Sequence, residues 1–134
     1  MSNLEDLQQQ AHKNARDKGF HAVADRLKVH VEELRSQDPE LAALILSSYY
    51  SNRLMLIVGE LSEAHEELRT GHLMSDVYVN EDGKKPEGVP VELADVGIRL
   101  MDLSEEAKIS LENEIGKKMN FNSERPQLHG NKTF

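Results

Sequence analysis

The segment between Asp38 and Gly71 constrains the fold of this chain more than any other feature of the sequence. Its apolar residues recur at helical spacing, which predicts one long helix from about Pro39 to Thr70. Asp38 followed by Pro39 is typical of a helix start, and Gly71 is typical of a helix stop. Apolar residues are especially dense at 54–58, so more than one side of this helix should be buried. We therefore expect a central helix of a bundle or a helix at a subunit interface.

The rest of the chain also has helical patterns, apart from one insertion. Helical spacing, N-cap residues and glycine stops predict further helices over about 2–18, 20–36, 90–107 and 110–121. Residues 72–90 are rich in turn-forming residues, and we expect a loop or small hairpin there. The tail from 122 to 134 is polar and should be extended. These elements predict an all-α bundle of about five helices with a short insertion at 72–90, in a single domain over 1–134.

Composition argues against several classes of protein. The formal charge of −8 disfavours a nucleic-acid-binding module, because such domains need a basic surface. With no cysteine, the chain has no disulfide framework, thiolate metal site or cysteine nucleophile. We see no apolar run near the roughly 20 residues that span a bilayer, and the acidic Met1–Asp6 segment is unlike a secretory signal. We therefore expect a cytoplasmic protein that binds neither nucleic acid nor membrane.

Two short acidic motifs carry the candidate chemistry: Glu60 with Glu63, and Glu92 with Asp95. In each motif the carboxylates are three residues apart, so they share one helix face with Cβ atoms roughly 5–6 Å apart. Each pair borders the apolar stripe of its helix, where packing of the two helices would bring all four acids together. Converging carboxylates repel one another unless a cation or protons intervene. Oxygen ligands without Cys or His in the pattern favour Mg²⁺, or alternatively Mn²⁺, over zinc.

Two other interpretations compete with this one. Either motif alone is more simply explained as a solvated helix face in an acidic chain. Both motifs at the same edge of consecutive long helices favour a metal site instead. A di-iron carboxylate bundle would need Glu-x-x-His on two helices, and no Glu here has a His three residues later. The sequence therefore predicts a magnesium site.

The acidic motifs resemble the paired motifs of the MazG-like all-α nucleoside triphosphate pyrophosphohydrolases. Lys18-Gly19-Phe20, the segment 85–99 and the segment 118–130 are similar to further parts of that family's pattern, as seen in bacteriophage and bacterial members. The resemblance covers most of the chain beyond about residue 54 and is weaker before it. It implies Mg²⁺-dependent hydrolysis of a nucleoside triphosphate, in particular a deoxynucleoside triphosphate, to the monophosphate and pyrophosphate. It also implies a homodimer or homotetramer.

The resemblance further implies roles for individual residues. The metal ligands would be Glu60, Glu63, Glu92 and Asp95. The candidates for phosphate and sugar contacts would be Lys118, Asn122 and Arg125. Any general base should be one of the same acids, and we favour Glu63. Residues 41–58 and 72–90 match no variant of the family that we can place, so the sequence does not predict a base preference.

Several alternatives stay open. Lys118 and Arg125 could instead complement a helix dipole, Asn122 could be a helix C-cap, and His129 could be an ordinary surface residue. The chain could also be a non-catalytic module for oligomerisation or partner binding, or could act on another nucleotide such as phosphoribosyl-ATP. The apolar density of residues 41–58 exceeds what one side of a helix in so short a chain should bury. It therefore predicts a homo-oligomer.

Overall fold

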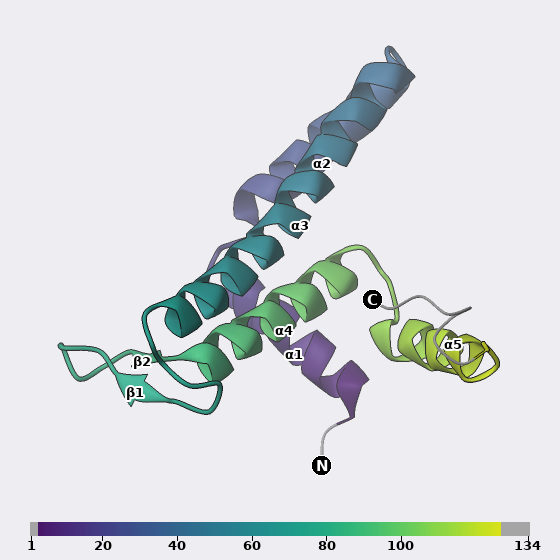
Figure 1. Ribbon diagram of the computed structural model, residues 1–134. Helices are drawn as coiled ribbons and strands as arrows, with labels where there is room; N and C mark the ends of the chain where they lie inside the picture. Colours follow the sequence, from purple (N-terminus) through teal and green to yellow (C-terminus); the bar gives the residue numbers. More distant parts are fainter. Residues whose placement is uncertain (1–2, 127–134) are drawn as a thin grey trace.

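A computed structural model describes residues 3–126 and shows an all-α protein with one very small sheet (Figure 1). Its elements are α1 (Leu4–Asp17), α2 (Ala22–Arg35), α3 (Pro39–Arg69), β1 (Tyr78–Val79), β2 (Pro86–Glu87), α4 (Val89–Glu106) and α5 (Leu111–Ser123). The predicted fold class and the predicted insertion are confirmed. The helix ends lie within two residues of the predicted ones, and one of these differences matters: α5 runs to Ser123, so Asn122 lies inside the helix rather than at its C-cap or in an extended tail.

The helix ends follow from local chemistry. Asn3 and Asp6 form a capping box at the start of α1, in which the backbone N–H of Asp6 donates to Asn3 Oδ1 at 2.7 Å. Asp38 caps α3 by accepting a hydrogen bond from the backbone N–H of Leu41 at 2.9 Å, and Pro39 takes the first helical position. From there α3 continues unbroken for 31 residues. It is long enough to contact α2 along one part and α4 along another.

The pairing of α3 with α4 positions the acidic motifs. α1 also packs against α4, α2 packs against α3, and α5 packs on α1. Figure 1 shows α2 and the first part of α3 as an arm that projects away from α4, with α5 as a separate arm. The buried apolar residues are few and mostly small: Ala11, Ala24, Val31, Ala42, Ala64, Val89 and Leu103. Small residues let helix backbones approach closely, so side chains at the edge of α3 come within reach of α4.

The insertion leads directly into α4. Its strands β1 and β2 pair antiparallel, with Tyr78 opposite Glu87. Gly88 follows with a φ of 116°, in the region that favours glycine. A Cβ atom on Gly88 would lie 2.1 Å from the carbonyl oxygen of Asp76. Only glycine fits where the hairpin meets the helix, and this junction fixes Glu92, one turn later, relative to the hairpin.

The chain exposes more surface than a compact monomer of its size. Its accessible area is 10087 Å², against roughly 7100 Å² expected for a monomeric protein of 15.2 kDa. Part of the excess is a row of exposed apolar side chains on α3: Leu44, Leu54, Met55, Val58 and Leu61. We call these five residues the α3 face. It belongs to the helix for which the sequence predicted a subunit interface.

Our expectation about apolar length was wrong. By length and composition alone, α3 could cross a membrane. This is weak evidence for a membrane, because the core helix of a soluble protein passes the same test. Little of the apolar stretch is buried within the chain, although the described elements together form a helical bundle of the kind found in soluble proteins.

Candidate metal centre

Three of the four predicted acids converge where α3 lies against α4. Glu60 comes from α3, whereas Glu92 and Asp95 come from the first two turns of α4. One carboxylate oxygen of Glu60, one of Glu92 and one of Asp95 all lie within 4.8 Å of one another. Metal–oxygen bonds are about 2.0–2.6 Å long for Mg²⁺ and Ca²⁺. These oxygens can therefore share one divalent cation after small side-chain adjustments.

Glu92 is the least exposed of the four predicted acids. Its relative exposure is 3%, and no side chain within residues 3–126 gives its carboxylate a hydrogen bond or an ion pair. Burial raises the pKa of Glu92, the charge of Glu63 raises it further, Lys85 lowers it, and Asp95 and Glu60 raise it again. A buried, unpaired carboxylate is costly to ionise. The site therefore favours either a proton or a cation beside Glu92.

The remaining predicted acid, Glu63, lies beside this cluster rather than in it. It is exposed on α3, yet its charge is close enough to raise the pKa of Glu92. Glu60 is buried and accepts a hydrogen bond from Nε of Arg99 at 2.5 Å. Packing therefore brings carboxylate oxygens of three acids within 4.8 Å of one another and leaves the fourth, Glu63, exposed but close to Glu92.

A cavity of about 480 Å³ adjoins the acids and is lined by α1, α3 and α4. Its wall includes Glu60 and Asp95 together with the cations Lys18, Arg53 and Arg99. The rest of its lining is mainly apolar, with Asp102 and two amides, and includes Phe20, Leu56, Ile98, Met101, Gln10 and Asn14. Cavities of this volume commonly hold small-molecule ligands. This one offers cations for an anionic group and an apolar wall for a ring.

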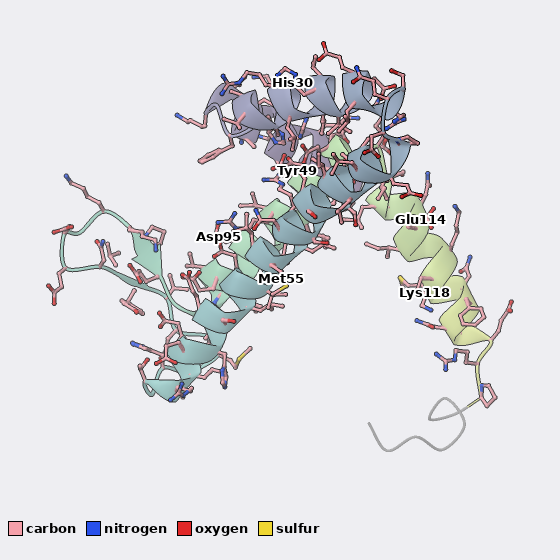
Figure 2. The ribbon with its side chains drawn as sticks, turned by 90° about the horizontal axis from the view of Figure 1, so that it is seen from above. His30, Tyr49, Met55, Asp95, Glu114 and Lys118 are labelled. Carbon is pink, nitrogen blue, oxygen red and sulfur yellow. The ribbon has the colours of Figure 1, made fainter. Side chains whose placement is uncertain are left out.

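The structure does not bring the predicted substrate residues of α5 to the acids of the same chain. Lys118, Asn122 and Arg125 are exposed, and the helix that carries them packs on α1. Figure 2 shows Lys118 on an arm separated from Asp95. Within the chain, Lys118 Nζ lies 4.9 Å from the centre of the Phe121 ring, a cation–π contact. His129 lies outside the described residues.

A second cluster of ionisable side chains is centred on Asp102. His12 and His21 each place a ring nitrogen 2.8 Å from Asp102 Oδ1, and Arg53 binds its other oxygen. Burial would raise the pKa of Asp102, but hydrogen bonds from the two rings and Arg53 hold it below its ordinary value. His12, His21 and Asp102 have the spacing of a metal site. The guanidinium already neutralises Asp102, so we assign this cluster a structural role.

Glu106 extends the same network toward α2 and α3. Its Oε1 accepts from Lys28 Nζ at 2.8 Å and from the Tyr49 hydroxyl at 2.6 Å. Burial opposes ionisation here too, yet Lys28 and Tyr49 hold the pKa of Glu106 below its ordinary value. Two acids, Asp102 and Glu106, thus face two cations, Arg53 and Lys28, in one network. The network ties the first four helices together.

Sequence reasoning missed the cations of the cavity and the Asp102 cluster. Arg99 is 39 residues from Glu60 along the chain, so no local pattern relates the two. One signal was present: Arg99 follows Asp95 by four residues, which places a cation on the same face of the helix as the acidic motif. That spacing alone also describes an ordinary exposed ion pair.

Comparison with known proteins assigns no family. No protein-family model matches the chain, and no curated protein or solved structure matches it.

Proposed function

We propose that this protein is a divalent-metal-dependent hydrolase that converts nucleoside triphosphates, in particular deoxynucleoside triphosphates, to the monophosphate and pyrophosphate. The observation that carries the proposal is Glu92, a residue only 3% exposed whose carboxylate lies within 4.8 Å of the carboxylates of Glu60 and Asp95. Such an arrangement is costly unless a cation joins it. The resemblance of the same acids to the motifs of MazG-like pyrophosphohydrolases supports the reaction class.

The donor set fits Mg²⁺ or Mn²⁺. The converging atoms are all carboxylate oxygens, which suit these hard ions, and no histidine is among them. When bound, Mg²⁺ would offset phosphate charge and activate a water nucleophile. Glu63 is exposed beside the three converging acids, so we assign its carboxylate to accept the proton of the attacking water.

The cavity supports a nucleotide as the substrate. Phe20 and the other apolar side chains of the wall suit a base, and the amides of Gln10 and Asn14 can hydrogen-bond its polar edge. Lys18 and Arg99 line the same cavity as two of the acids and can offset the charge of a triphosphate. Lys18 and Phe20 also belong to a segment that resembles the family.

We further propose that the α3 face packs against a second copy of the chain. The accessible surface exceeds the expectation for a monomer by about 3000 Å². This excess is larger than the roughly 800 Å² that each partner buries in a standard interface. An assembly is also the setting in which Lys118, Asn122 and Arg125 of one copy could approach the acids of another. The proposed phosphate role of these three residues depends on it.

The direct test is pyrophosphate release by the purified protein with each nucleoside and deoxynucleoside triphosphate. We expect monophosphate and pyrophosphate in equal amounts with Mg²⁺ or Mn²⁺, and no turnover in EDTA. Ca²⁺ should bind but support little turnover, because its longer bonds and looser geometry misplace the water. Asp95→Asn should lower the rate by orders of magnitude. The matched control is Glu66→Gln, which removes an exposed α3 acid that pairs with Arg69.

Three results would change the assignment. Full activity in EDTA would refute the metal centre. A rise in melting temperature with Mg²⁺, without turnover of any nucleotide, would favour a non-catalytic helical module. Turnover of phosphoribosyl-ATP alone would keep the site and the reaction but change the substrate.

A further inference from the structure

Arg99 connects the acids to the cavity. Its Nε donates to Glu60 Oε1 at 2.5 Å, and its side chain is part of the cavity wall. Glu92, Asp95 and Arg99 follow one another at three and four residues on α4, so they lie along one face of that helix. The guanidinium is therefore held at the edge of the acidic cluster.

The pairing of Arg99 with Glu60 leaves most of the guanidinium available. An arginine side chain carries five N–H donors, and Glu60 takes only the one on Nε. Neither terminal nitrogen of Arg99 has a hydrogen-bond partner in the part of the chain that the structure describes. The side chain is 42% exposed, so these donors are open to a ligand. Guanidinium groups with free paired donors bind phosphate oxygens well.

We infer that Arg99 is a counter-ion with two partners: it neutralises Glu60 in the metal-free protein, and it binds a phosphate oxygen of the substrate once a divalent cation is bound. The inference rests on the proposed function. Its physical basis is competition, because a second cation at Glu60 repels the guanidinium and weakens the Arg99–Glu60 pair. A triphosphate in the adjoining cavity then offers Arg99 a new anionic partner.

Two substitutions and one control separate this role from simple packing. Arg99→Gln removes the charge, Arg99→Lys keeps it without the planar fork, and Arg69→Gln removes an exposed α3 cation that pairs with Glu66. Each protein would be measured for its melting temperature in EDTA and for its Mg²⁺ affinity by calorimetry without nucleotide. A third measurement is the affinity for inorganic tripolyphosphate in the presence of Mg²⁺.

We expect opposite effects on the two ligands. Arg99→Gln should melt lower in EDTA, since the acids lose a counter-ion, but should bind Mg²⁺ roughly three- to tenfold more tightly because a competing cation is gone. Its affinity for tripolyphosphate should fall by roughly tenfold. Arg99→Lys should bind Mg²⁺ like the wild type and bind tripolyphosphate with intermediate affinity. Arg69→Gln should change neither affinity.

The outcomes distinguish this inference from the proposed function. If wild-type protein binds Mg²⁺ and Arg99→Gln binds it equally well or more weakly, the counter-ion role is wrong while the metal centre stands. Unchanged tripolyphosphate binding by Arg99→Gln would likewise overturn the phosphate role alone. A wild-type protein that binds no Mg²⁺ would overturn the proposed function and this inference together.

Discussion

Replacing Glu92 by glutamine tests whether the acids are held together against their mutual repulsion. Glu92 is 3% exposed, and its carboxylate lies within 4.8 Å of those of Glu60 and Asp95. Glutamine keeps the size of the side chain, removes its charge and supplies an amide that can donate to both neighbours. We therefore expect metal-free Glu92→Gln protein to be more stable at neutral pH than the metal-free wild type.

Coulomb's law sets the magnitude. Two unit charges 4.8 Å apart repel by roughly 1 kcal/mol in bulk water and by about 3.5 kcal/mol at an effective dielectric constant of about 20. Glu92 has two such neighbours and the charge of Glu63 nearby, but Lys85 and the pairing of Arg99 with Glu60 offset part of the repulsion. We expect the free energy of unfolding to rise by roughly 1–3 kcal/mol, which corresponds to a melting temperature higher by about 3–12 °C.

The pH dependence gives a second check on the sign. Burial, together with the neighbouring acids, raises the pKa of Glu92 in the folded protein above its ordinary value of 4.5. The stability that Glu92 contributes in the wild type is therefore fully present below pH 4.5 and is lost as the pH rises through the raised pKa. The advantage of Glu92→Gln should be present at pH 7 and should disappear near pH 4.

Thermal melts at both pH values, with EDTA and with Mg²⁺, measure all of these effects. Mg²⁺ should raise the melting temperature of the wild type more than that of Glu92→Gln, because the variant has lost a ligand. Glu66→Gln should behave like the wild type throughout. A metal-free Glu92→Gln protein that melts below the wild type at pH 7 and keeps the full response to Mg²⁺ would refute the reasoning.

Three further predictions test the fold around the site. Gly88→Ala should lower both the melting temperature and the rise in melting temperature caused by Mg²⁺, because a Cβ has no room there. Gly59→Ala is the control: a Cβ at Gly59 meets open space, so the rise caused by Mg²⁺ should not be smaller. Asp102→Asn should cost about 1–3 kcal/mol in urea unfolding at pH 7, because Arg53 loses its shorter ion pair and keeps only the one to Glu106. That difference should shrink as the pH falls below 3.8 and through the lowered pKa of Asp102. Met55→Glu should shift the assembly toward monomer in light scattering, and a wild-type mass of 15.2 kDa would contradict the α3 interface.

Local signals in the sequence determined the secondary structure. Asp38 and Pro39 begin α3 because the carboxylate satisfies a free backbone N–H and proline suits the first helical position. Turn-forming residues marked the hairpin insertion, where the required Gly88 has its positive φ. These effects act over a few residues, so they can be recognised without knowing the fold. The spacing within each acidic motif is local in the same sense.

The apolar pattern of α3 did not predict correctly which parts of the helix are buried within the chain. The density of apolar residues in α3 indicated more than one buried side, but it did not show which side α4 would cover. In the structure the α3 face stays exposed, although the helix is apolar enough to resemble a membrane span. Hydrophobic burial depends on area and not on a specific partner, so the sequence cannot tell a second subunit from a helix of the same chain.

Only the tertiary structure separated the acids from one another. In the sequence, the Glu60–Glu63 pair and the Glu92–Asp95 pair look equivalent, yet packing buries Glu92 and leaves Glu63 in solvent. The partner of Glu60 is Arg99, 39 residues away, and the cavity beside them is lined by three helices. Exposure, the pKa of a carboxyl group and the identity of its counter-ion all depend on which side chains meet across helices. Residue spacing along one helix cannot supply that information, because the relevant contacts are made between segments distant in the chain.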